Sequence, residues 1–143
     1  MDVQFAVDAP QLPTAENIRD WAVGSFDENA SGELTVRIVG KDEIQKLNMM
    51  YRKIDKPTNV LSFPADWETE DGSVYIGDIA ICAEVLTAEA KAQVTPLQAQ
   101  WAHMVVHGVL HLCGYDHQNT IDAEKMEAQE VVVLAQFGFA SPY

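Results

Sequence analysis

Long hydrophobic runs, paired cysteines and positive charge are all scarce in this chain of 143 residues. No apolar stretch approaches the ~20 residues that span a bilayer, and the N-terminal sequence shows neither a basic start nor an apolar signal core. We therefore expect no membrane contact and a cytoplasmic location. The two cysteines, Cys82 and Cys113, form no short-spaced motif, so we expect reduced core residues rather than a disulfide framework.

The shortage of basic residues bears on the kind of partner. Nine lysines and arginines stand against 22 acidic residues, which gives a formal net charge of −13 and argues against a nucleic-acid partner. Six of the nine basic residues lie in one segment, residues 37–56, which holds only three acidic residues. This segment is either a solvated helix face with a basic loop, or a positive strip that orients a polyanion repelled elsewhere by the acidic body.

The pattern of apolar residues predicts one α+β domain, 1–143, with a small mixed sheet of about four strands and helices packed around a central one. Strands are predicted over 3–7, 33–39, 60–63 (ended by Pro64) and 74–82. Helices are predicted over 14–27, 42–51, 83–93, 96–113 and 120–138, with Thr14, Asp42 and Thr120 as capping residues and a polar turn over 27–33. The helix over 96–113 is apolar nearly all round, so we expect it to be central and buried.

Histidine, by contrast, is concentrated: all four histidines fall within fifteen residues. His107 and His111 are four residues apart, so on a helix their imidazoles project from the same face. Gly114 can adopt the left-handed conformation that commonly ends a helix, which allows the chain to turn back and bring His117 toward the other two. Three imidazoles with a fourth position open are the arrangement of a catalytic zinc site.

The spacing matches the zinc-protease pattern H-E-x-x-H-x-x-G-x-x-H at its ligand and turn positions, His107, His111, Gly114 and His117. The glutamate that acts as general base in those enzymes is replaced by Gly108. The chain therefore has the metal cage without the base, and either the site performs other chemistry or the base comes from elsewhere.

Two further side chains flank the predicted ligands. His103 lies one helical turn upstream of His107. It could be a fourth metal ligand, a partner that orients a ligand, or a substrate contact. Because residues drift around a helix axis, three successive turns rarely converge on one ion, which favours the last two alternatives. Asp116 precedes His117, and it either orients an imidazole through its second nitrogen or stabilises the turn after Gly114.

Four segments resemble the YbeY family of bacterial metal-dependent endoribonucleases: LNMMYRKIDKPTNVLSFP (47–64), IGDIAI (76–81), HGVLHLCGYDH (107–117) and MEAQEVVVLAQFGF (126–139). The likeness extends over about residues 33–139, with the motifs in the family order, although Asn59 stands where the family more often has aspartate. The resemblance implies a mixed sheet with surrounding helices, in agreement with the pattern above.

The resemblance also implies a function and a site. His107, His111 and His117 would bind one zinc ion per chain, and Arg52 would engage the substrate, so we predict these four as catalytic and His103 as a further substrate contact. The implied role is cleavage of single-stranded RNA in ribosomal RNA processing, including maturation of the small-subunit RNA 3′ end, and in ribosome quality control. Ribosomal particles or an associated protein are the implied partners.

The sequence leaves the chemistry and two other functions open. Either a zinc-activated hydroxide or the ribose 2′-OH attacks the phosphodiester, and imidazoles bind nickel as well as zinc. A metallohydrolase of peptides or small substrates would use the same cage, although Gly108 removes its expected base. A non-catalytic, zinc-stabilised ribosome assembly factor is the other alternative, which the charge of −13 favours.

Overall fold

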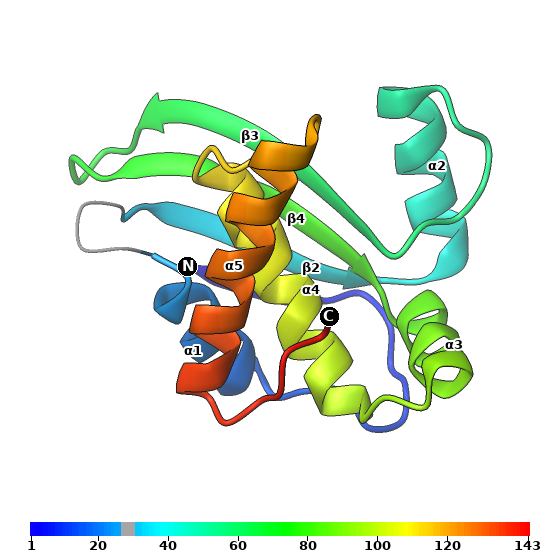
Figure 1. The fold of residues 1–143 in the computed structure, drawn as a ribbon. Helices are drawn as coiled ribbons and strands as arrows, with labels where there is room; N and C mark the ends of the chain where they lie inside the picture. The colour runs from blue at the N-terminus through cyan, green and yellow to red at the C-terminus, as the bar shows by residue number, and fades with distance from the viewer. Residues whose placement is uncertain (27–30) are drawn as a thin grey trace.

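The structure is a computed structural model that describes residues 1–26 and 31–143. Within these residues it contains four strands and five helices (Figure 1). The strands are β1 (Asp2–Phe5), β2 (Glu33–Val39), β3 (Val60–Glu68) and β4 (Val74–Cys82). The helices are α1 (Ala15–Gly24), α2 (Lys41–Arg52), α3 (Ala83–Gln93), α4 (Leu97–Leu112) and α5 (Thr120–Gln136). The α+β prediction is confirmed, while the polar turn predicted over 27–33 falls partly outside the described residues.

The sheet has the strand order β1-β2-β4-β3. β1, β2 and β4 run parallel to one another, whereas β3 runs antiparallel to β4 and forms one edge of the sheet. Successive residues of a strand point to opposite faces, and β4 buries both of its faces. Ile79 and Ile81 belong to the main core, and Ala80 and Cys82 belong to a second, smaller core.

The two cores divide the helices between the faces of the sheet. α1 and α4 pack on the face that carries Ile79, and α5 packs on α4, as the front layer of Figure 1 shows. α2 and the start of α3 close the second core on the other face. Trp101, Val105 and Val109 of α4 are completely or almost completely buried, and each such side chain contributes about 1.5–3 kcal/mol of burial free energy. The predicted central position of this helix is confirmed.

Pro64 does not end β3, contrary to the prediction. Proline is tolerated on an edge strand, where its missing N–H need not face a partner. The pairing of β3 with β4 also shifts register between Pro64 and Trp67, opposite Gly77. Gly77 has a φ of +143°, and a Cβ there would lie 2.4 Å from the carbonyl oxygen of Phe63, so only glycine permits this bulge.

Only one of the three predicted helix caps is confirmed. Thr14 caps α1, because its hydroxyl accepts the N–H of Asn17 at 3.1 Å. Asp42 lies inside the first turn of α2, which starts after Gly40 without a side-chain cap. Asn119, not Thr120, is the extended residue before α5.

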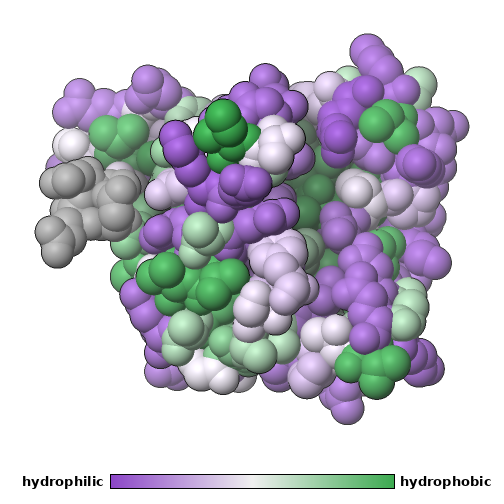
Figure 2. Space-filling view, in the orientation of Figure 1, coloured by the Kyte–Doolittle hydropathy of each residue, from purple (hydrophilic) through white to green (hydrophobic). Residues whose placement is uncertain are grey.

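The surface of the molecule agrees with its acidic composition. Within the described chain, no helix has both the length and the apolar character needed to cross a bilayer. Figure 2 shows hydrophilic side chains over most of one face, with a hollow that separates the α4–α5 layer from α2 and has apolar atoms at its base. Cys82 is buried in the second core, as predicted, whereas Cys113 is only partly buried and packs against the main core.

Candidate metal centre

The last two turns of α4 and the turn that follows bring three histidines together. Gly114 adopts a φ of +102°, so the chain reverses direction after the helix, as the sequence predicts. The potential ligand nitrogens of His107, His111 and His117 lie within 4.8 Å of one another. The ring centroid of His111 lies 4.6 Å from that of His107 and 4.8 Å from that of His117.

These three imidazoles suit a divalent metal ion. Ligand nitrogens around a tetrahedral zinc ion lie roughly 3.4 Å apart, so small side-chain rotations suffice to close the observed spacing. Burial, together with the charges of His107 and His117, lowers the pKa of His111, which favours the neutral, metal-binding form of its ring. The group could therefore hold a metal ion, with the side that faces the cleft left for other ligands.

A buried carboxylate from α5 contacts the first of these histidines. Glu130 is 0% exposed, and its Oε1 accepts a hydrogen bond from Nδ1 of His107 at 2.7 Å. Its Oε2 accepts bonds from Nε2 of His103 at 2.8 Å and from the hydroxyl of Tyr143. Burial by itself raises the pKa of Glu130, but the three hydrogen bonds outweigh it and lower the pKa to about 2. The carboxylate is therefore ionised.

Sequence reasoning did not find Glu130, although the sequence contains a signal for it. The buried positions of α5 are Met126, Glu130, Val133 and Leu134. Their spacing is that of an apolar helical stripe in which one member is an acid. A charged residue on such a stripe needs a specific partner when it is buried, and two histidines of α4 provide it.

The two flanking residues of the histidine row have different surroundings. Asp116 accepts the backbone N–H of His117 at 2.7 Å, which is the turn-stabilising alternative. The His103 side chain is 14% exposed and lies against Glu130 and Tyr143. It borders a hollow formed with the start of α4 and the C-terminal segment rather than the cleft described next, so its contact with substrate stays a prediction.

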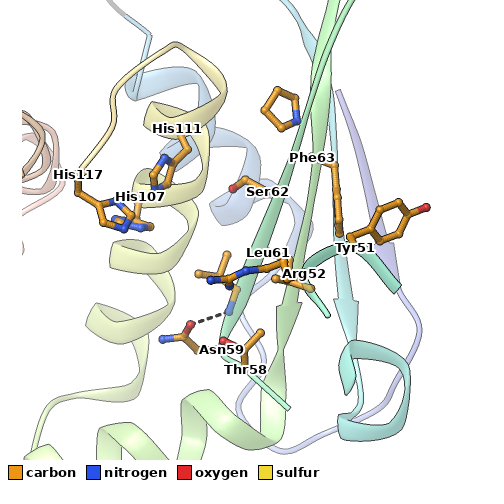
Figure 3. Close-up of a pocket in the computed structure, with 12 residues that line it drawn as sticks. Tyr51, Arg52, Thr58, Asn59, Leu61, Ser62, Phe63, His107, His111 and His117 are labelled. Carbon is orange, nitrogen blue, oxygen red and sulfur yellow. Dashed lines mark hydrogen bonds between the residues drawn. The ribbon is translucent and has the colours of Figure 1, made fainter. Parts of the chain in front are cut away.

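A cleft of about 700 Å³ extends from the three histidines to the end of α2. Its other lining residues are Tyr51 and Arg52 of α2, Thr58 and Asn59 of the connecting loop, and Val60–Pro64 of β3. Figure 3 shows the histidines grouped on the α4 side, with Arg52, Phe63 and Tyr51 on the side of β3 and α2. The edge of β3 thus forms one wall of the cleft.

Arg52 is the cation that the cleft offers to a ligand. It is the last residue of α2, and Lys53, with a φ of +61°, turns the chain away in a left-handed conformation. Arg52 is exposed and makes no hydrogen bond or ion pair with any other residue that the structure describes. Arg37, in the same basic segment, is instead paired with Glu43 at 2.7 Å. The guanidinium of Arg52 is therefore available to an anion in the cleft.

Gly108, at the position of the protease glutamate, faces the sheet. A Cβ at this position would lie 3.0 Å from two side-chain atoms of Ile79 on β4. Ile79 would have to shift to admit a side chain there. The close packing of α4 on β4 therefore disfavours a glutamate at this position.

Comparison with known proteins identifies the family of this chain. The model of the family described as endoribonuclease YbeY matches residues 8–138. A protein of Hydrogenovibrio crunogenus named endoribonuclease YbeY is 49% identical over an alignment that covers all of this chain and 96% of the relative. The solution structure of TM1509 from Thermotoga maritima is similar, with a TM-score of 0.62 and 26% identity over 96% of this chain and 92% of that one. The chain therefore belongs to the endoribonuclease YbeY family.

Proposed function

We propose that this protein is a zinc-dependent endoribonuclease that cleaves single-stranded RNA. The observation that carries the proposal is the placement of the Arg52 guanidinium, unpaired among the residues that the structure describes, in the same cleft as His107, His111 and His117. A phosphodiester between them would meet a metal ion on one side and a fork of N–H donors on the other. The name of the Hydrogenovibrio crunogenus relative supports the same substrate class.

Each side of the cleft has its own task in this proposal. Zinc held by the three imidazoles supplies Lewis acidity toward the phosphodiester when it is bound. Arg52 donates hydrogen bonds to the phosphate oxygens and holds the scissile group in place. Whether the attacking oxygen comes from water or from the ribose 2′-OH, Arg52 also stabilises the negative charge that develops on the phosphate.

The side of the cleft formed by β3 and the end of α2, here called the β3–α2 wall, suits single-stranded RNA better than a duplex. Tyr51 is 61% exposed, and its ring meets that of Phe63 edge to face at 4.9 Å between centroids. Both rings line the cleft next to Arg52. An unpaired base can stack on such a ring, whereas a paired base has its faces covered within the helix.

The peptidase alternative lacks support at Gly108. In zinc proteases with this histidine spacing, the general base follows the first ligand. Here even the Cβ of such a side chain would lie 3.0 Å from Ile79, so the main core would have to shift to admit it. In the proposed RNA cleavage, bound zinc would supply much of the activation that this base provides in the proteases.

The net charge of −13 favours delivery of the enzyme to its substrate by a partner. We propose ribosomal particles, or a protein associated with them, as that partner, and ribosomal RNA as the substrate. Maturation of the small-subunit RNA 3′ end and ribosome quality control are the processes in which such an enzyme would act.

The test uses protein purified without a histidine tag and analysed for its metal content. We expect one zinc ion per chain, lost in His111→Ala, and internal cleavage of an unstructured RNA blocked at both ends, also lost in His111→Ala. Nickel in place of zinc would correct the metal but not the reaction. Hydrolysis of casein alone would establish the peptidase instead. Melting on chelation without cleavage of either substrate would establish the assembly factor.

A further inference from the structure

The carboxylate of Glu130 is unusual because it is fully buried and lies outside the cleft. Its residue is 0% exposed and is absent from the cleft lining. An ionised carboxylate in such surroundings is costly unless donors surround it. Three side chains do so: His103 and His107, one helical turn apart on α4, and Tyr143 of the C-terminal segment.

The bond to His107 determines which nitrogen of this ring is free. Oε1 of Glu130 lies 2.7 Å from Nδ1 of His107, so this contact occupies Nδ1 and suits a ring that carries its proton there. Nε2 is then the unprotonated nitrogen with a lone pair. Metal-binding histidines commonly have their second nitrogen bonded to a carboxylate in this way, which fixes both tautomer and ring orientation.

The remaining two donors hold Glu130 itself. His103 lies one helical turn before His107 and reaches Oε2 at 2.8 Å, while the hydroxyl of Tyr143 bonds the same oxygen. The Tyr143 hydroxyl also lies 3.3 Å from Nε2 of His103. The carboxylate is therefore fixed from two sides, and its rotation is restricted before any ion arrives.

We infer that Glu130 is a positioning residue which, held by His103 and Tyr143, fixes His107 as an Nε2 ligand for the metal ion. The inference rests on the proposed use of His107, His111 and His117 as the metal site. It assigns His103 an indirect role, through Glu130, in addition to its predicted contact with substrate.

A second metal ion is the competing explanation of the same residues. His103, His107 and Glu130 also offer ligand atoms within 4.8 Å of one another, and the two groups share His107. An ion there would have to displace the hydroxyl of Tyr143 and take the proton from Nδ1 of His107. Because these hydrogen bonds already satisfy the carboxylate, they favour a positioning role for Glu130 over a second metal site. The number of metal ions bound per chain distinguishes the two explanations.

The test measures zinc affinity, by competition with a chromophoric chelator, in two variants of Glu130 and one control variant of Glu127. Glu130→Met removes the acceptor at similar size, Glu130→Gln keeps a carbonyl acceptor without charge, and Glu127→Gln removes the same charge from an exposed position of α5. We expect about 10- to 100-fold weaker binding in Glu130→Met, a smaller loss in Glu130→Gln and none in Glu127→Gln.

A second readout distinguishes positioning from general stability. Long-range ¹H–¹⁵N spectra of the metal-free protein should show His107 as the Nδ1–H tautomer in the unmodified chain, and a mixture of tautomers in Glu130→Met. Unchanged tautomer and affinity in Glu130→Met would overturn the inference, as would two ions per chain with the second lost in this variant. If Glu130→Met does not fold, Glu130→Gln decides alone, and affinity equal to that of the unmodified chain overturns the inference.

These outcomes are independent of RNA cleavage. A chain that binds one zinc ion but leaves RNA intact would refute the proposed function and leave the role of Glu130 standing. If the protein cuts RNA with zinc, and Glu130→Met binds zinc as tightly as the unmodified chain, the proposed function stands and the role of Glu130 is refuted.

Discussion

His107 and Arg52 line the same cleft, yet the surrounding protein holds them in opposite ways. A buried carboxylate bonds the second nitrogen of His107, whereas Arg52 is exposed and has no partner in the described part of the chain. The metal side is thus ordered by the packing of α5 on α4 before any ligand binds. The α2 side keeps its guanidinium free to adapt to a flexible strand. In the proposed function, a site that holds a metal ion tightly and releases RNA would need both arrangements.

The largest effect should come from the exposed side, through Arg52→Ala. We expect kcat/KM for cleavage of an unstructured RNA to fall about 10²- to 10³-fold, because donors to the developing phosphate charge are lost. Zinc content and thermal stability should not change, since the side chain is exposed. Arg52→Lys should recover only part of the rate, because an ammonium lacks the planar fork.

Lys46→Ala is the matched control for Arg52. It removes the same charge from an exposed position of α2 that borders a different hollow. An equal loss of cleavage in both variants would mean that general positive charge, and not a specific contact of Arg52, serves the substrate.

The second prediction concerns the sheet-facing side of α4. Gly108→Glu should lower the free energy of unfolding by at least about 3 kcal/mol, because it forces an unpaired carboxylate against Ile79. Thermal or urea unfolding measures this loss. Gln98→Glu adds the same charge at an exposed position of α4 and should be nearly neutral. A stable Gly108→Glu protein that hydrolyses casein would contradict our account of the missing base.

The third prediction concerns how the stability that Glu130 contributes depends on pH. The hydrogen bonds to Glu130 hold its pKa at about 2, below the ordinary value of 4.5. Its contribution to stability is therefore complete above pH 4.5 and is lost as the pH falls toward 2. In metal-free protein this contribution amounts to about 3 kcal/mol. Urea unfolding at several pH values should show a shallower acid loss in Glu130→Gln, and equal slopes in both proteins would contradict the assignment.

The smallest effect is expected from Tyr51→Ala. Loss of one stacking surface should raise KM for single-stranded RNA about tenfold with little change in kcat, since one stacked base contributes about 1–3 kcal/mol. Met50→Ala is the control, because Met50 is exposed on the same helix and does not line the cleft. If both variants behave alike, the β3–α2 wall does not bind bases through its rings.

Local patterns predicted much of the fold correctly. The ranges of β2, β4 and α3 agree with the prediction, because alternation and helical periodicity are properties of short segments. The extent of β3 was wrong, because proline at position 64 interrupts a strand only where its N–H is needed, and the edge position of β3 is not visible in the sequence. Two caps were also wrong, since several polar residues near a helix start can each serve as a cap.

The sequence by itself determined the histidine cluster, because all three predicted ligands lie on one helix and the turn after it, where spacing fixes geometry. Tertiary structure alone decided what surrounds it. The packing of α5 on α4 places Glu130 against His107, and the edge position of β3 opens the cleft that Arg52 shares with the histidines. Both contacts join segments far apart in the chain. Their positions depend on how whole helices and strands pack, which the spacing of residues within one segment does not encode.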